Sequence, residues 1–200
     1  MKTVILHGLG QTAQDWKEVV HQLTISDIEC PELFSVTEDE ISYSQILGDL
    51  EHRYSKVKEP LRICGLSLGA LLAIDFAIRN EEKVASLVLI GAQYKVPSLL
   101  IDFQNFIFHC MPNKAFESMG LSKNNTIKLA HSMRSLDFTS QLNNIHCPVT
   151  ILCGKRDIAN LKASKRLKEL LLQATLHIVP NAGHELNKYT PNTVADILNQ

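Results

Sequence analysis

Gly65-Leu66-Ser67-Leu68-Gly69 is the stretch of this sequence that most constrains the fold. The stretch Leu61-Arg62-Ile63-Cys64 before it predicts a short strand. The Ala- and Leu-rich stretch Ser67–Arg79 predicts a helix that is apolar almost all round, and therefore buried. Glycine two residues either side of a serine permits a turn in which larger side chains would clash, and this turn lifts the hydroxyl clear of the sheet. The context favours such a nucleophile elbow over an ordinary glycine-containing turn.

Outward from this turn, short apolar runs alternate with amphipathic stretches. The runs predict strands at Thr3–His7, Ile28–Val36, Leu61–Cys64, Val84–Ile90, Val149–Cys153 and Thr175–Val179. Amphipathic stretches predict helices at Ala13–Leu23, Ser42–Val57, Leu161–Leu172 and Thr190–Leu198, in addition to the apolar helix Ser67–Arg79. Strands that are apolar on both faces predict an α/β fold, a mainly parallel sheet of about six strands with helices on both faces. Pro31 indicates that its strand is broken or lies at the sheet edge.

The segment Gln93–His146 interrupts this alternation because it contains no convincing strand. We expect two or three helices there, forming a short helical cap inserted into a single domain that spans residues 1–200. The insert holds five of the seven phenylalanines and three of the four methionines. Two interpretations stay open, an apolar lid over an acyl or alkyl group, or side chains that only pack the insert onto the sheet. On the first interpretation, the residues expected to line a substrate pocket are Phe103, Phe106, Met111 and Met133.

Composition excludes several classes of function. The net charge is −1, so nothing points to nucleic acid or an anionic membrane as a partner. The five cysteines are widely spaced and form no Cys-x-x-Cys pair, which argues against a disulfide framework or a metal site. Reduced thiols indicate a cytoplasmic protein. The apolar run after Met1-Lys2 is too short for a signal peptide, and no run approaches the length of a membrane span.

Two more motifs follow predicted strands, Gly154-Lys155-Arg156-Asp157 and Asn181-Ala182-Gly183-His184. The carboxyl ends of parallel strands gather at one edge of a sheet, so Ser67, Asp157 and His184 are expected to meet there. A serine hydroxyl needs a base to accept its proton, and a carboxylate fixes the tautomer of that base. His177 is a rival to His184, but it lies within a strand pattern. Asp157 could serve only as a helix cap, although its position at a strand end favours catalysis.

Together with His7-Gly8-Leu9-Gly10 and Trp16, these motifs resemble the α/β-hydrolase superfamily over nearly the whole chain, in the order serine, acid, histidine. The resemblance implies that Ser67 is the nucleophile, His184 the general base and then acid, and Asp157 its orienting group. It implies an oxyanion hole made by the backbone N–H groups of Leu9 and Leu68, and a reaction that needs no metal or organic cofactor. The usual first two strands of the superfamily are absent, which places Ile28–Val36 at an edge.

These features predict a serine hydrolase that cleaves a small, largely apolar ester or thioester through an acyl-enzyme. A carbon–carbon bond hydrolase, a perhydrolase or a lyase would use the same triad, so the motifs do not separate them. The stretch Leu68–Leu72 after the serine carries no cation, which argues against a lyase with a highly anionic substrate. A third hypothesis is a binding protein that keeps the scaffold without turnover, but an intact triad argues against it.

Overall fold

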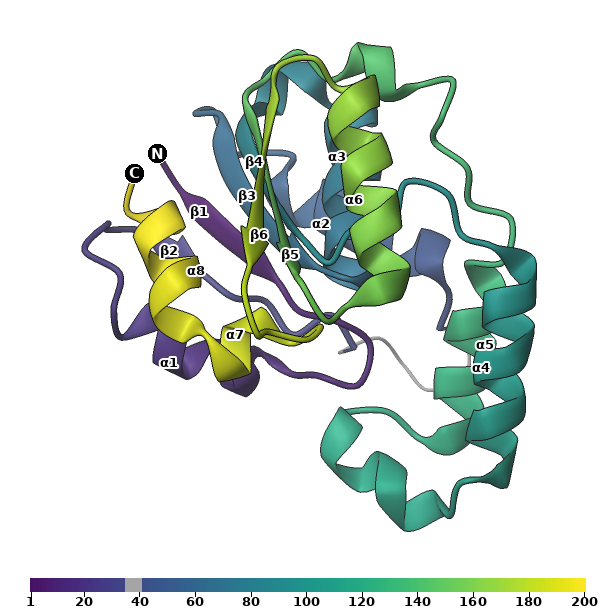
Figure 1. The fold of residues 1–200 in the computed structure, drawn as a ribbon. Helices are drawn as coiled ribbons and strands as arrows, with labels where there is room; N and C mark the ends of the chain where they lie inside the picture. Colours follow the sequence, from purple (N-terminus) through teal and green to yellow (C-terminus); the bar gives the residue numbers. More distant parts are fainter. Residues whose placement is uncertain (35–40) are drawn as a thin grey trace.

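The computed structural model describes residues 1–34 and 41–200, apart from the side chains of residues 99, 100, 103, 104, 106 and 117–119. Its centre is a parallel six-stranded sheet in the order β2-β1-β3-β4-β5-β6 (Figure 1). The strands are β1 (Thr3–Leu6), β2 (Ile28–Glu29), β3 (Leu61–Leu66), β4 (Val84–Ile90), β5 (Val149–Gly154) and β6 (Ala174–Val179). The predicted α/β fold with about six parallel strands is therefore confirmed.

The predicted strand Ile28–Val36 is wrong in its length. Only Ile28 and Glu29 pair with β1, at the sheet edge, and residues 35 and 36 lie outside the described part of the chain. Pro31 has no N–H to donate to a neighbouring strand, so pairing ends just before it. The expected edge position is confirmed.

Two apolar layers cover the sheet, because alternate strand residues point to opposite faces. Leu87 and Leu89 of β4 pack with α2 (Tyr43–Tyr54), α3 (Leu68–Arg79) and α6 (Ile158–Leu170). Val88 and Ile90 instead pack with the other group of helices, α1 (Lys17–Val20), α7 (Leu186–Tyr189) and α8 (Pro191–Leu198). Figure 1 shows these two helix groups on opposite sides of the sheet.

Two predicted helices differ clearly in their bounds, and one observed helix was not predicted. The expected helix Ala13–Leu23 is divided into a 3-10 turn, η1 (Ala13–Trp16), and α1, and the chain leaves helical geometry after Val20. The helix expected from Leu161 begins three residues earlier, at Ile158, directly after Asp157. The short helix α7 lies in a stretch for which the sequence predicts no helix. The first-turn residues of α6 thereby come close to the end of β5.

Residues 93–146, which we call the cap, join β4 to β5 and contain α4 (Ser98–Cys110), η3 (Asn113–Met119), α5 (Lys123–Ser132) and η4 (Leu142–Asn144). An isolated antiparallel bridge between Lys95 and Asp137 closes the base of the cap. Ile101, Leu129 and Met133 bury their side chains in the same core layer as α2 and α3. Figure 1 shows α4 and α5 side by side at one end of the sheet. In the described part of the chain, no helix combines the length and apolar character needed to cross a membrane.

Candidate active site

Ser67 stands between β3 and α3 in a strained conformation, with φ 55° and ψ −111°. A positive φ is uncommon for any residue but glycine, and such strain persists only where the surroundings enforce it. A Cβ added at Gly65 would overlap the backbone of Gly69, and one at Gly69 would overlap the carbonyl of Leu6. Both glycines are therefore required by backbone contacts, as the turn motif predicts.

The two predicted oxyanion donors have no hydrogen-bond acceptor among the described residues. The N–H of Leu68 is in the first turn of α3, where no preceding helical carbonyl can accept it. Leu9 lies in the loop after β1, between Gly8 and Gly10, whose φ is +80°. Among the described residues, neither the Leu9 nor the Leu68 N–H donates a hydrogen bond. The helix N-terminus at Leu68 also favours developing negative charge.

Asp157 and His184 form a close pair, with 2.7 Å between Asp157 Oδ2 and His184 Nδ1. Asp157 follows β5, and its side chain is only 8% exposed. His184 follows β6 and is 36% exposed. Burial alone would raise the pKa of Asp157, but hydrogen bonds and charge from His184 and Asn160 lower it below the usual value. The ionised carboxylate accepts a hydrogen bond from the Nδ1–H group of His184. This leaves Nε2 of His184 without a proton, so it can accept one from a nucleophile.

Gly91 brings the serine and the Asp–His pair to one place. The Ser67 N–H donates to the carbonyl of Ile90 at 3.0 Å. At the next residue, a Cβ on Gly91 would lie 2.8 Å from the imidazole of His184 and 3.4 Å from Asp157 Oδ2. The three predicted catalytic residues thus flank the end of β4. Within the described part of the chain no hydrogen bond joins Ser67 Oγ to His184; such bonds often shorten only when substrate is bound.

Two side chains at this site are missed by the sequence analysis. Asn160 Nδ2 donates to both oxygens of Asp157, at 2.8 and 3.0 Å, and Gln93 Nε2 donates to Asn160 Oδ1 at 2.8 Å. With the helix expected from Leu161, Asn160 falls in a loop and gives no signal. The three-residue spacing from Asp157 would have pointed to it if the helix start had been placed correctly.

Three other residues with reactive side chains, His7, His177 and Cys64, lie outside the Asp157–His184 pair. His7 is fully buried; its Nδ1 donates to the Gly8 carbonyl, and its Nε2 accepts from the Leu33 N–H at 3.1 Å. Burial lowers the pKa of His7, so the ring is neutral and shapes the loop after β1. His177 is exposed on the edge strand β6. Burial raises the pKa of the fully buried Cys64 thiol, which suits a core residue.

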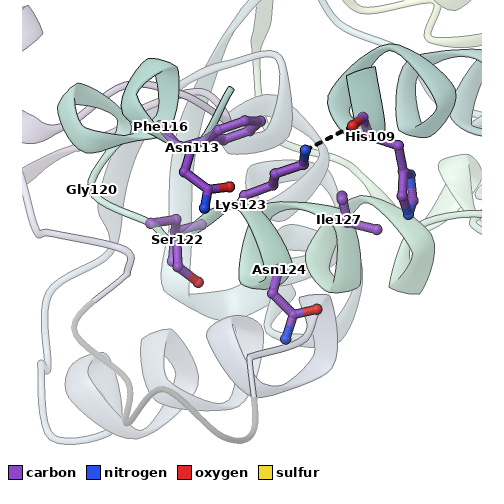
Figure 2. Close-up of a pocket in the computed structure, with 9 residues that line it drawn as sticks. His109, Asn113, Phe116, Gly120, Ser122, Lys123, Asn124 and Ile127 are labelled. Atoms are coloured by element: carbon purple, nitrogen blue, oxygen red, sulfur yellow. Dashed lines mark hydrogen bonds between the residues drawn. The ribbon is translucent and has the colours of Figure 1, made fainter. Parts of the chain in front are cut away.

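The predicted pocket residues lie in different environments. The side chains of Phe103 and Phe106 lie outside the described residues. Met111 is half-buried at the end of α4, whereas Met133 is 5% exposed and packs in the core. The cap contains a cavity of about 740 Å³ between the end of α4, η3 and the start of α5 (Figure 2). Its lining combines apolar and polar side chains, among them Phe116, Leu121, Ile127, His109, Asn113 and Lys123. That these four residues line a substrate pocket stays a prediction.

Comparison with known proteins finds relatives by both sequence and structure. No family model matches the chain. A provisionally named 2-succinyl-6-hydroxy-2,4-cyclohexadiene-1-carboxylate synthase of Bacillus subtilis is 23% identical, over 98% of this chain and 88% of its own length. The enol-lactonase of Burkholderia xenovorans superposes with a TM-score of 0.84 at 15% identity, covering 100% of this chain and 92% of that chain. A thermophilic esterase of Thermogutta terrifontis superposes with a TM-score of 0.83 at 18% identity, covering 99% of this chain and 88% of the esterase chain.

Proposed function

We propose that this chain, which has the α/β-hydrolase fold, is a serine hydrolase that cleaves a small, largely apolar ester or thioester. The observation that carries the proposal is the 2.7 Å Asp157–His184 pair at the same strand end as the strained Ser67 turn. A buried ionised acid, a histidine with a free Nε2 and a serine raised above the sheet are the parts that acyl transfer requires. The resemblance read from the motifs is confirmed for the fold by the sheet and the structural neighbours.

The proposed reaction has two acyl-transfer steps. Ser67 Oγ attacks the substrate carbonyl while His184 Nε2 takes its proton, and the N–H groups of Leu9 and Leu68 donate to the oxyanion. When the tetrahedral intermediate collapses, His184 returns the proton to the departing alcohol or thiol, which leaves an acyl group on Ser67. Water, deprotonated by His184, then releases the acid. One oxyanion donor lowers the barrier by about 3–4 kcal/mol in a well-studied protease, and no cofactor is needed.

The substrate class rests on two observations. The names of the two structural neighbours, an esterase and an enol-lactonase, both refer to ester bonds. The first turn of α3 beside Ser67 is apolar. We propose a small-molecule partner rather than nucleic acid or a membrane. The five cysteines are all free, which fits a reducing, cytoplasmic location.

A lyase reaction is the second candidate, because the Bacillus subtilis relative is provisionally named as a synthase. The same Ser67, His184 and Asp157 would serve it, as they would a carbon–carbon bond hydrolase or a perhydrolase. The absence of a cation in Leu68–Leu72 favours the ester. A panel of short-chain esters, thioesters and β-diketones separates the ester hydrolase from the carbon–carbon bond hydrolase, since an ester hydrolase turns over the first two groups and leaves the last intact.

The decisive test of the nucleophile uses a fluorophosphonate probe and intact-mass measurement. Ser67 Oγ should displace fluoride from phosphorus, so the wild type gains the mass of one probe less HF. Ser67→Ala should gain none, and Ser44→Ala, an exposed serine on α2, should label like the wild type. Labelling of Ser67→Ala would show that another residue is the nucleophile and contradict the proposal. No labelling of the wild type would also contradict it and would favour a binding protein.

A second test addresses the acid. Asp157→Asn should lower kcat by about 10³- to 10⁴-fold, because an amide in place of the carboxylate no longer favours the tautomer with a free Nε2. Thermal unfolding of the variant measures its stability in the same samples. A variant that loses stability but keeps its turnover would show that Asp157 is only a helix cap.

A further inference from the structure

We propose that Asn160 is a positioning residue that holds the Asp157 carboxylate in register with His184, and that Gln93 sets the orientation of the Asn160 amide. The inference rests on the proposed function, since it concerns the same acid and base. It adds two residues for which the motifs of the sequence give no signal.

The contacts of Asp157 carry the first step. The single Nδ2 of Asn160 lies 2.8 Å from Oδ1 and 3.0 Å from Oδ2, so it spans both carboxylate oxygens. It also lies 3.2 Å from His184 Nδ1, so two donors converge on Oδ2. The backbone N–H of Asn160 also donates to this carboxylate and helps to lower the pKa of Asp157. The Asn160 side-chain amide contacts both oxygens, so it limits rotation about the Cβ–Cγ bond and keeps Oδ2 turned toward the imidazole.

The direction of the Asn160 amide carries the second step. An ionised carboxylate only accepts hydrogen bonds, so the end of Asn160 that faces Asp157 must be its NH₂ group. Gln93 Nε2 donates to the opposite end, Asn160 Oδ1, at 2.8 Å. The hydrogen bonds therefore all point the same way: Gln93 donates to Asn160, and Asn160 donates to Asp157. Reversing the Asn160 amide would bring its carbonyl against the carboxylate and leave two facing acceptors.

The fold explains why these residues meet. Asp157 precedes α6, and Asn160 is in the first turn of that helix, so a three-residue spacing places both side chains on one side. Gln93 comes three residues after the end of β4, the strand next to β5. It is also the first residue of the cap, just before the Lys95–Asp137 bridge. Gln93 thus connects the base of the cap to the catalytic acid.

The test compares two substitutions at Gln93. Gln93→Met keeps the length of the side chain and removes the donor. Gln93→Glu replaces the donor with an acceptor, to which Asn160 can donate only by turning its NH₂ away from Asp157. We therefore expect kcat on p-nitrophenyl butyrate to fall further for Gln93→Glu than for Gln93→Met, with KM changed less than about threefold. Asn160→Ala should lower kcat and the fluorophosphonate labelling rate by roughly 10- to 100-fold, the scale of a small misplacement of catalytic groups.

A double-substitution cycle makes the mechanism specific. In the Asn160→Ala background, the difference between Gln93→Glu and Gln93→Met should shrink to the part caused by the negative charge of Glu, because no amide remains to be reversed. Asn192→Ala, an exposed asparagine in the first turn of α8, is the matched control and should keep wild-type rates. Circular dichroism melts of every variant check folding.

The outcomes separate this inference from the proposed function. If the wild type is not labelled at Ser67, the proposed function fails first. If the wild type is labelled and Asn160→Ala reacts at the same rate, the positioning role alone is overturned. If Asn160→Ala does not fold, Gln93→Glu and Gln93→Met are compared in the protein that keeps Asn160. Equal kcat for Gln93→Glu and Gln93→Met then overturns the inference, and a larger loss for Gln93→Glu supports it.

Discussion

The carboxyl edge of the sheet and the cap are held together by different kinds of contact. At the sheet edge, a Cβ added to Gly65, Gly69 or Gly154 would overlap backbone atoms of a neighbouring segment. In the cap, a Cβ on Gly120 would meet only side-chain atoms, those of Thr12 at 3.4 Å and Phe34 at 3.6 Å. Backbone cannot be moved without moving whole strands, whereas side chains can repack. The turns at these three glycines are therefore fixed by backbone contacts, whereas Gly120 in the cap is restricted by its φ of +70° and not by a backbone neighbour.

The largest effect on stability should come from adding a side chain where two backbone segments touch at the sheet edge. Gly69→Ala forces α3 away from the end of β1, and we expect the free energy of unfolding to fall by about 4 kcal/mol or more. Urea titration followed by circular dichroism measures it. Gly48→Ala is the control, because nothing lies within 4 Å of a Cβ at this position in α2. It should raise stability by up to about 1 kcal/mol. Equal changes in the free energy of unfolding for Gly69→Ala and Gly48→Ala would show that the backbone contact at Gly69 does not constrain the sheet edge.

A buried aromatic residue in the cap should show a large but local effect. Phe116 is 1% exposed and packs edge-to-face on Phe108, with ring centroids 5.8 Å apart. Phe116→Ala should cost about 3 kcal/mol of packing within the cap. Hydrogen exchange should then accelerate in α4 and α5 while β3, β4 and β5 keep their protection. Met133→Ala, which opens the shared core, should accelerate exchange in both regions. Uniform loss of protection in Phe116→Ala would show that the cap does not open separately.

The strained serine should yield a smaller change of opposite sign. Ser67→Gly relieves the positive φ at the elbow, so the free energy of unfolding should rise by about 1 kcal/mol relative to Ser67→Ala, which keeps the Cβ and its strain. Both variants lack the hydroxyl and should lack turnover. A Ser67→Gly variant no more stable than Ser67→Ala would mean that the turn stores no strain.

The smallest effect should be a dependence of stability on pH that originates at the sheet edge. Burial lowers the pKa of His7 in the folded chain, whereas an unfolded histidine titrates near 6.5. The unfolded state therefore binds more protons as pH falls below about 6.5, and the free energy of unfolding should drop by at most about 1 kcal/mol at pH 6. Above about pH 7.5 this contribution is constant.

His7→Gln keeps one acceptor and one donor but cannot be protonated. The difference in unfolding free energy between wild type and His7→Gln should narrow as the pH is lowered from 8 to 6. A difference that stays constant over this range would show that His7 does not contribute to the pH dependence.

Ser67, Asp157 and His184 could be placed at one edge of the sheet from the sequence, and their catalytic roles stay a prediction. Ser67 lies in a turn that only flanking glycines permit, and Asp157 and His184 follow strands whose parallel order brings their ends together. Asn160 and Gln93 have no such local signature. Their roles depend on the start of α6 and on the route of the chain into the cap, and both are decided by packing between distant segments.

The amino-acid sequence by itself determined the order of the strands and helices, the sharp turn at Ser67 and the acid and base expected to serve it. These follow from apolar periodicity and from local sterics, which act within a few residues. Only the tertiary structure decided that pairing stops before Pro31, that Met133 belongs to the core, and that Asn160 bridges Gln93 and Asp157. Each of these depends on contacts between segments far apart in the chain, whose distances no local pattern encodes.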